Sequence, residues 1–175
     1  IADAIRSMTG ISIHEEVIPP AEIDAAVRDR AVTLNGLEIS RMAWIVEALS
    51  PDRVYIDLIG HSAEKFSSSL RGLMSVNPVI IAEHKADSTY PITAAASIIA
   101  KTRRDAEIER LNERYESRFG PLGSGYPGDP KTIAFLKRTR SDLSRIDDSD
   151  GVSHIFRRSW ATYTASSTCS MTAPV

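Results

Sequence analysis

Two short apolar runs on either side of a helical pattern constrain the fold of this chain more than any other feature. Residues 54–59 read VYIDLI and residues 79–83 read VIIAE, and between them a helical pattern follows Ser62. Such runs are typical of strands that are buried on both faces of a sheet. A strand, a helix and a second strand at this spacing predict a βαβ unit with parallel strands. The chain is therefore expected to be an α/β protein.

Helical patterns occupy much of the remaining chain, and apolar spacing, prolines and capping residues mark where they begin and end. We expect helices over residues 2–8, 20–30, 34–49, 62–74, 93–118 and 130–140, the last with Asp129 as its N-cap ahead of Pro130. Residues 11–18 favour a short strand, and Trp44 is expected to be a packing residue. Residues 119–129 form a loop rich in Gly and Pro. We expect residues 141–153 to be loosely structured and residues 164–175 to form a disordered tail.

The composition is that of a soluble protein with a single domain. The 175 residues are enough to bury a core, and 42% hydrophobic and 25% charged residues are ordinary proportions. The one cysteine, Cys169, excludes an intrachain disulfide. The sequence shows neither an apolar run of membrane-spanning length nor a secretory signal at its start. These features predict a cytoplasmic protein without a membrane partner.

Charge is distributed unevenly along the chain. Residues 1–83 contain 7 Lys and Arg against 12 Asp and Glu, whereas residues 84–175 contain 14 against 11. The second part therefore carries a net positive charge, although the whole chain has a net charge of −2. A local basic surface favours a polyanionic partner. The alternative is that these charges lie on solvated helix faces and pair along the helix.

Asp57 and Asp87 are the residues that most favour catalytic chemistry. A carboxylate within an apolar strand is costly to bury unless it is paired or bound to a metal. Because ligands of α/β sheets bind at the carboxyl ends of the strands, Asp57 and Asp87 are expected at one sheet edge. Two carboxylates there favour Mg²⁺ or Mn²⁺ over zinc. Alternatively, Asp57 pairs with an arginine or caps a loop, and Asp87 caps the turn before Tyr90.

Several cations and histidines accompany the two acids. His84 and His61 are candidates for acid–base roles, but a lone histidine is as compatible with a structural role. Each cation is by itself also compatible with an ordinary surface position. The cations that could contact phosphate are Lys85, Lys101, Arg103 and Arg104.

The loop Gly123–Ser124–Gly125–Tyr126–Pro127 is a candidate nucleic-acid contact. Its glycines allow the backbone to approach a ligand closely, and Tyr126 presents an aromatic ring beside them. Aromatic rings beside sugars or bases are a common mode of nucleic-acid recognition. The alternative is a connection between two helices with Tyr126 in the core.

Several segments of the chain together resemble ribonuclease HII, particularly its archaeal members. Their order and spacing also match, and the resemblance covers roughly residues 11–163. We therefore expect a ribonuclease HII-like domain over residues 1–163. The matching segments are TLNGLE (33–38), YIDLIG (55–60), EHKADSTYPITAAASIIAKTRRD (83–105), GSGYPGDP (123–130) and RRSW (157–160).

This resemblance implies a fold, an activity and a cofactor. The expected fold is ribonuclease H-like, with a mixed sheet flanked by helices and a C-terminal helical region. The expected activity is endonucleolytic cleavage of the RNA strand of RNA–DNA hybrids, and of duplex DNA at single ribonucleotides. The resemblance further implies two-metal hydrolysis with Mg²⁺ or Mn²⁺, which leaves 5′-phosphate and 3′-hydroxyl ends. The expected protein is a monomer.

The resemblance also assigns roles to individual residues. The family uses four acids, of which Asp57 matches the third and Asp87 the fourth, as catalytic residues and metal ligands. A second set, matching positions that contact the substrate, offsets phosphate charge or packs on the sugar next to the ribonucleotide. This expected nucleic-acid-binding set is Lys85, Tyr126, Gly125, Lys101 and Arg104.

The chain departs from the family pattern at its start. The family's first two acids belong to an N-terminal strand with an Asp-Glu-Ala-Gly-Arg-Gly type of motif, which this sequence lacks. We therefore expect the chain as given to be inactive and poorly stable without that segment. A non-catalytic module that binds RNA–DNA hybrids is the first alternative. An unrelated α/β phosphatase that uses Asp57 and Asp87 is the second, but it does not explain the loop around Tyr126.

Overall fold

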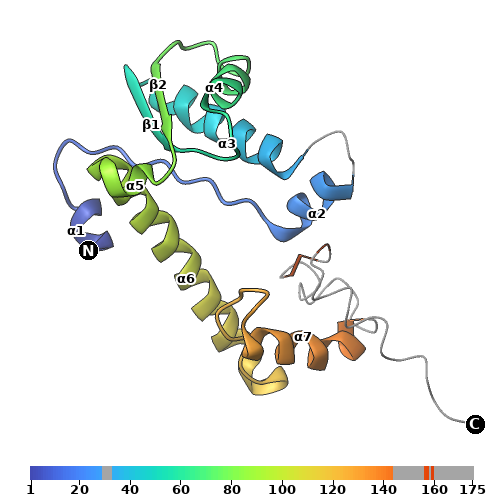
Figure 1. Ribbon diagram of the computed structural model, residues 1–175. Helices are drawn as coiled ribbons and strands as arrows, with labels where there is room; N and C mark the ends of the chain where they lie inside the picture. The colour runs from blue at the N-terminus through green and yellow to red at the C-terminus, as the bar shows by residue number, and fades with distance from the viewer. Residues whose placement is uncertain (29–32, 144–155, 158, 160–175) are drawn as a thin grey trace, which may run out of the picture. The chain divides into compact units, whose positions relative to one another are not determined.

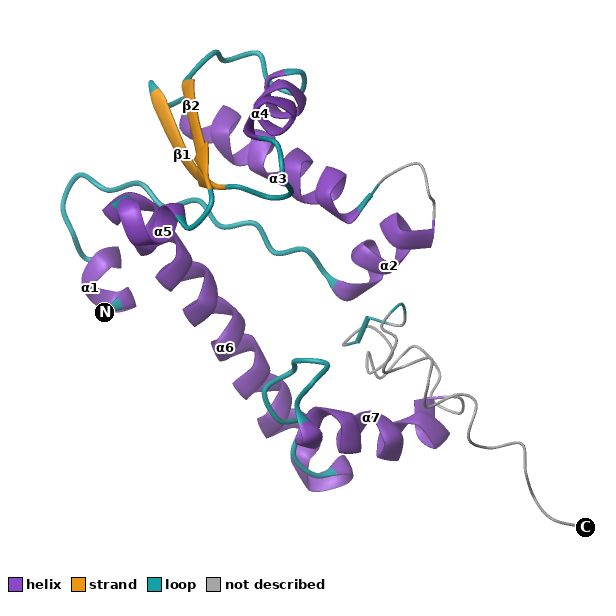
Figure 2. Ribbon diagram, in the orientation of Figure 1, coloured by secondary structure: helices purple, strands orange, loops and turns teal. Residues whose placement is uncertain are grey.

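The computed structural model describes residues 1–28, 33–143, 156, 157 and 159. None of the helices within these residues is long and apolar enough to cross a membrane. The elements, shown in Figures 1 and 2, are α1 (Ala2–Arg6), α2 (Pro20–Arg28), α3 (Leu34–Leu49), β1 (Arg53–Asp57), α4 (Ala63–Arg71), β2 (Val79–Glu83), α5 (Ala86–Thr89), α6 (Pro91–Phe119) and α7 (Pro130–Leu143).

The chain divides into two compact units, each with its own core. The first contains residues 1–17 and 30–103, and the second contains residues 18–29 and 104–175. The long helix α6 contributes residues to both.

The first unit is organised around the expected βαβ arrangement. β1 and β2 pair in parallel, from Arg53 opposite Val79 to Asp57 opposite Glu83, and α4 lies between them in the chain. Helices α3 and α4 pack together, and α4 also packs on β2. The core of this unit is formed by Ala43, Ile56, Phe66 and Leu70. The α/β class and the parallel βαβ unit that the apolar runs predict are thus confirmed.

Local capping explains where the helices of this unit begin. The Thr33 side chain accepts a hydrogen bond from Gly36 N at 3.1 Å, so α3 begins after it, and Ser62 accepts one from Lys65 N at 3.2 Å ahead of α4. Both are N-caps, which satisfy backbone donors that lack a partner within the helix. The expected helix over residues 34–49 is confirmed, whereas the helix predicted over 62–74 ends at Arg71.

Hydrogen bonds to Glu47, which the sequence did not predict, fix the connection from α4 to β2. The Glu47 carboxylate on α3 accepts hydrogen bonds from Ser75 N and from Val76 N, the latter at 3.1 Å. These bonds, together with one from the Ser75 hydroxyl, hold the pKa of Glu47 below its usual value. The connection is therefore tied to a helix rather than free to move as a surface turn.

Three expectations about the first unit are wrong. Residues 11–18 form no strand in the described part of the chain, because a strand needs a hydrogen-bonded neighbour and this segment has none there. The strands are not buried on both faces: in β1 only Ile56 is buried, because one face packs on α4 and the described sheet has two strands. Trp44 is not a core residue, since it is 52% exposed and meets His14 edge-on.

The second unit has an aromatic core between the end of α6 and α7. Its buried members are Tyr115, Phe119, Leu122, Phe135, Leu136 and Phe156. Helix α2 joins the same unit through Asp24, a buried carboxylate that accepts a hydrogen bond from Ser159 N at 3.0 Å. A buried charge needs such a partner.

The prediction for the end of the chain is tested only in part. Helix α7 runs to Leu143, so the expectation of loose structure over 141–153 is wrong for its first three residues. The rest of that segment and the predicted tail at 164–175 lie outside the described residues. The domain boundary at residue 163 stays a prediction.

Candidate functional site

The carboxyl ends of β1 and β2 bring the first group of predicted site residues together. β1 ends at Asp57, and its Oδ1 accepts a hydrogen bond at 2.8 Å from the backbone N–H of Lys85, which follows β2. The Asp57 side chain is exposed rather than buried, which corrects the argument that a buried charge there must be compensated. An exposed carboxylate at this edge is accessible to a ligand.

Lys85 makes the turn that places Asp87. It adopts a left-handed conformation, with φ 59° and ψ 36°, and directly precedes α5. This conformation costs a residue other than glycine on the order of 1 kcal/mol, and the hydrogen bond to Asp57 offsets that cost. Asp87 then lies in the first turn of α5, half-buried, where its Oδ1 accepts a long hydrogen bond of 3.5 Å from the Ser88 hydroxyl.

A tyrosine and a glutamate flank this edge, and no sequence pattern predicted their pairing. The Tyr90 hydroxyl donates a hydrogen bond to Glu83 Oε1 at 3.1 Å, and the Tyr90 and Tyr55 rings lie 4.7 Å apart. The hydrogen bond to Glu83 raises the pKa of Tyr90 above its ordinary value of 10, and desolvation adds to the effect. Glu83 is thereby engaged by Tyr90.

The donor chemistry of this edge fits a hard divalent cation. Asp57 and Asp87 supply carboxylate oxygens, which Mg²⁺ and Mn²⁺ prefer. Within residues 1–28, 33–143 and the few described beyond them, no three His, Cys, Asp or Glu side chains are grouped closely enough to hold a metal. The two acids therefore fit as part of a ligand set. Lys101, which lies in the same unit, is exposed on α6, and His84 and His61 are exposed as well.

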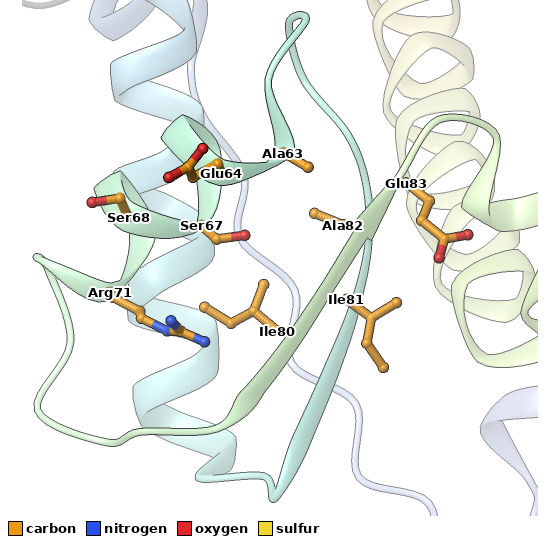
Figure 3. A pocket seen from close by; sticks show the side chains of 9 residues that line it. All are labelled: Ala63, Glu64, Ser67, Ser68, Arg71, Ile80, Ile81, Ala82 and Glu83. Atoms are coloured by element: carbon orange, nitrogen blue, oxygen red, sulfur yellow. The ribbon is translucent and has the colours of Figure 1, made fainter.

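A pocket of about 600 Å³ lies nearby, between α4 and β2 (Figure 3). It contains neither Asp57 nor Asp87, and its lining combines a single cation, Arg71, with small polar and apolar side chains. The lining also includes two carboxylates, and its residues are Ala63, Glu64, Ser67, Ser68, Arg71, Ile80, Ile81, Ala82 and Glu83. The candidate site at the strand ends is therefore an exposed edge rather than this pocket.

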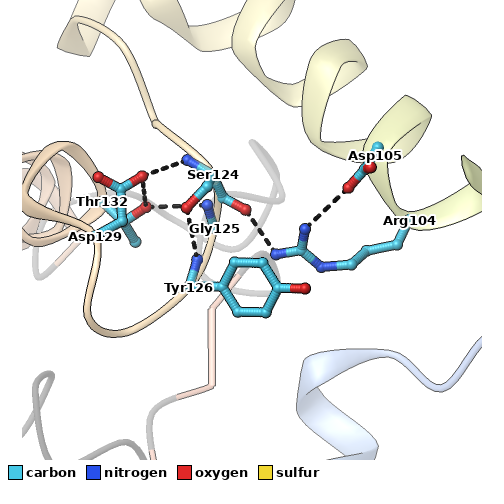
Figure 4. A network of polar contacts seen from close by, with 7 residues as sticks. All are labelled: Arg104, Asp105, Ser124, Gly125, Tyr126, Asp129 and Thr132. Atoms are coloured by element: carbon cyan, nitrogen blue, oxygen red, sulfur yellow. Dashed lines mark hydrogen bonds and ion pairs between the residues drawn. The ribbon is translucent and has the colours of Figure 1, made fainter. Parts of the chain in front are cut away.

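In the second unit, Asp129 organises the loop that carries Tyr126 (Figure 4). Its carboxylate accepts hydrogen bonds from Ser124 N at 2.6 Å and from Lys131 N at 2.9 Å. The second bond caps α7, as the sequence predicted for an Asp ahead of Pro130. Hydrogen bonds from Ser124, first from its backbone and then from its side chain, and from Lys131 lower the pKa of Asp129 to about 2. Asp129 is thus a structural anchor.

Gly125 lies at a position where a larger residue would be strained. Its φ is +71°, and a Cβ there would lie 2.6 Å from Ile108 Cδ1. Its N–H donates a hydrogen bond at 3.0 Å to the hydroxyl of Thr132, which is fully buried. Glycine is required for both reasons, because it alone adopts this φ without strain and it adds no side chain. The loop path is therefore fixed next to Tyr126.

Tyr126 is exposed and is held from one side by Arg104. Tyr126 is 56% exposed, so the alternative that it lies in the core is wrong. The Arg104 guanidinium lies 3.9 Å from the ring centroid. Arg104 Nη2 also donates a hydrogen bond to the Ser124 carbonyl at 2.6 Å, and Nη1 pairs with Asp105 at 3.1 Å. This arrangement, seen in Figure 4, was not predicted.

Solved structures place this arrangement in a known class of fold. The ribonuclease H2 of Pyrococcus horikoshii OT3 is similar with a TM-score of 0.69 and 33% identity, covering 85% of this chain and 65% of that chain. The ribonuclease HII in a complex with PCNA from Archaeoglobus fulgidus is similar with a TM-score of 0.67 and 32% identity, covering 89% and 77%. The fold is ribonuclease H-like, as expected.

Sequence comparison identifies the family within that class. Residues 1–163 match the family Ribonuclease HII. Ribonuclease HII of Methanoregula boonei is 40% identical over 146 residues, which cover 83% of this chain and 63% of the relative. Ribonuclease HII of Pyrococcus furiosus is 38% identical over 148 residues, covering 83% and 60%. The chain belongs to the ribonuclease HII family, and it spans about three fifths of the length of these relatives.

Proposed function

We propose that the protein is an endonuclease that cleaves the RNA strand of RNA–DNA hybrids and cuts duplex DNA at single embedded ribonucleotides. The match of residues 1–163 to ribonuclease HII carries this proposal. Asp57 at the end of β1 and Asp87 in the short helix after β2 support it, because they are oxygen donors near the edge where ligands of α/β sheets bind. We further propose that the products carry 5′-phosphate and 3′-hydroxyl ends.

Asp57 and Asp87 are the residues that we propose as metal ligands. One oxygen of the exposed Asp57 carboxylate accepts a hydrogen bond from the Lys85 N–H, and Asp87 lies in the short helix that follows Lys85. When bound, Mg²⁺ or Mn²⁺ would supply water activation and charge stabilisation at the leaving oxygen, for which we propose a two-metal site. The Asp57–Lys85 hydrogen bond holds the turn, so it fixes how far Asp87 lies from Asp57.

The cationic and aromatic residues would bind the nucleic acid. Lys85 and Lys101 are exposed in the first unit and would offset phosphate charge. Tyr126 would pack its exposed ring on a sugar, beside the backbone of Gly125. Arg104 would contribute to this second surface through its contacts around Tyr126. A monomeric state and a cytoplasmic location remain predictions.

Cleavage of a duplex that carries one ribonucleotide tests the proposal in the full-length protein. Asp57→Asn and Asp87→Asn should each abolish Mg²⁺- or Mn²⁺-dependent cleavage while binding of the duplex persists. Asp52→Asn is the matched control, because Asp52 is an exposed aspartate next to the opposite end of β1. Equal activity of all three variants would contradict the proposed roles.

The same assay separates the enzyme from the alternative module that only binds RNA–DNA hybrids. Binding by the wild-type protein that weakens with salt but needs no divalent cation, without any cleavage, would favour the non-catalytic module. Cleavage that requires the divalent cation and both aspartates would exclude it.

A further inference from the structure

We propose that Arg104 is a positioning residue that holds the Tyr126 ring for stacking on a nucleotide, and that it does not itself bind phosphate. The proposal rests on the proposed function for the identity of the ligand. The arrangement of the Arg104 and Tyr126 side chains is independent of the proposed function, because the free protein shows it. It differs from the simplest expectation for an arginine on a nucleic-acid-binding surface, namely a direct phosphate contact.

Two of the five N–H groups of Arg104, one on each Nη atom, are engaged by the protein. Its guanidinium carbon lies 3.9 Å from the centre of the Tyr126 ring, well within the range of a cation–π contact. Nη2 donates at 2.6 Å to the Ser124 carbonyl, and Nη1 donates at 3.1 Å to Asp105. A guanidinium binds phosphate best with two parallel N–H groups. The N–H groups that hold Ser124 and Asp105 are not available to a phosphate while Arg104 keeps these contacts.

The position of Arg104 determines which part of the ring a ligand can reach. The guanidinium occupies one face of Tyr126, yet the residue is still 56% exposed. A flat sugar or base would therefore stack on the opposite face. A cation on the near face and a nucleotide on the far face together resemble the sandwich by which aromatic side chains bind single nucleotides.

The loop is built around this arginine. A Cβ at Gly125 would lie 3.2 Å from Arg104 Nη2 as well as 2.6 Å from Ile108 Cδ1. The Ser124 carbonyl that receives Arg104 belongs to the residue whose N–H is held by Asp129 at 2.6 Å. Tyr126 is thus fixed through the backbone by Asp129 and over its face by Arg104. A neutral side chain would lose the cation over the ring, and a lysine lacks the planar guanidinium that stacks on the ring while donating from its edge.

Salt dependence of binding distinguishes positioning from phosphate contact. The probe is a duplex with one embedded ribonucleotide, and the variants of the full-length protein are Arg104→Lys and Arg104→Ala. A positioning role predicts that both variants weaken binding by roughly three- to tenfold and leave the slope of log K against log [salt] unchanged. A direct phosphate contact predicts that Arg104→Lys binds almost normally and that Arg104→Ala lowers the slope by about 0.9.

A double-mutant cycle adds a readout that a merely structural role would not reproduce. If Arg104 acts through the ring, Arg104→Lys should cost little further affinity once Tyr126 is Ala. Additive losses would overturn the proposal. Arg110→Lys is the matched control, because Arg110 lies on the same helix and is similarly paired, with Glu107 at 2.5 Å, but does not contact Tyr126.

The nuclear magnetic resonance signals of the Tyr126 ring test the arrangement without any nucleic acid. They can be assigned by their loss in Tyr126→Phe. The ring signals should shift in Arg104→Lys and stay in place in Arg110→Lys. An unshifted ring in Arg104→Lys would overturn the proposal even if the protein cleaves hybrids. Failure of the wild-type protein to bind the duplex would instead contradict the proposed function, while the ring signals would still decide the role of Arg104.

Discussion

Asp57 and Asp129 are both aspartates in candidate functional regions, but the protein uses their carboxylates differently. Asp129 accepts backbone hydrogen bonds at both oxygens, from Ser124 and Lys131, and its pKa falls to about 2. Asp57 accepts one backbone hydrogen bond, from Lys85, at an exposed strand end. A carboxylate with both oxygens occupied serves as an anchor, whereas one with spare acceptor capacity can take a cation. The loop around Asp129 is therefore held in place, whereas the strand end at Asp57 is available to bind a ligand.

The largest expected effect comes from replacing each of these two carboxylates by an amide. Asp57→Asn should lower cleavage by more than about 100-fold, since even partners outside a metal's own ligands are worth 10–100-fold. It should leave unfolding by urea nearly unchanged, because Asp57 is exposed and an amide can still accept the Lys85 N–H. Asp129→Asn should destabilise the protein more than Asp57→Asn and lower cleavage far less, because it can affect cleavage only through the loop that carries Tyr126. Equal losses of cleavage and of stability in the two variants would contradict the distinction between a structural anchor and a metal ligand.

The next largest effect concerns the backbone of the anchored loop. Gly125→Ala should destabilise the protein by about 1–3 kcal/mol, because the new methyl group meets Ile108 and the residue must keep a positive φ. Urea unfolding measures this loss. Gly128→Ala is the control in the same loop, since a Cβ there meets nothing within 4 Å. Equal stability of the two variants would show that the loop adapts and is not fixed.

The depressed pKa of Asp129 predicts a pH window for the anchor. Because the folded-state pKa of about 2 lies below the ordinary 3.8, the stability it contributes is complete above about pH 4. That contribution is lost as the pH falls through 2. The difference in unfolding midpoint between the wild type and Asp129→Asn should therefore shrink between pH 4 and pH 2. A difference that stays constant over this range would mean that the charge of Asp129 is not what holds the loop.

The smallest expected effect is at Tyr90, beside the acidic edge. Its pKa is raised, so the hydrogen bond to Glu83 contributes stability below about pH 10 and is lost as the pH rises through the raised value. Absorbance titration should show a late component from Tyr90. That component should disappear in Tyr90→Phe and return to the ordinary range in Glu83→Gln. A late component that survives in Glu83→Gln would assign the shift to another cause.

The sequence predicted those parts of the molecule that depend on local pattern. Apolar runs and helical spacing are short-range signals, so the βαβ unit and the bounds of α3 were found, as was the Asp129 cap ahead of Pro130. The same reasoning placed Asp57 at the end of the first strand and Asp87 a few residues after the second. It failed for residues 11–18, because alternation of apolar residues does not supply the neighbour that a strand needs.

The contacts that distinguish the two regions could not be predicted from spacing. Arg104 and Tyr126 meet because α6 and the loop fold back on one another, and neither residue carries a local signal for that pairing. The left-handed turn at Lys85 and the engagement of Glu83 by Tyr90 likewise depend on tertiary position. The exposure of Asp57 depends on how many strands flank β1, which the residues around Asp57 do not specify.

Binding of Mn²⁺ to the full-length protein tests most directly whether the Asp57 carboxylate, which has spare acceptor capacity, is the cation ligand. Free Mn²⁺ gives a strong electron paramagnetic resonance signal that is lost on binding, so titration reports the affinity in the absence of substrate. We expect Asp57→Asn to weaken Mn²⁺ binding at least tenfold and Asp129→Asn to leave it unchanged. Equal binding by the wild type and Asp57→Asn would contradict the account.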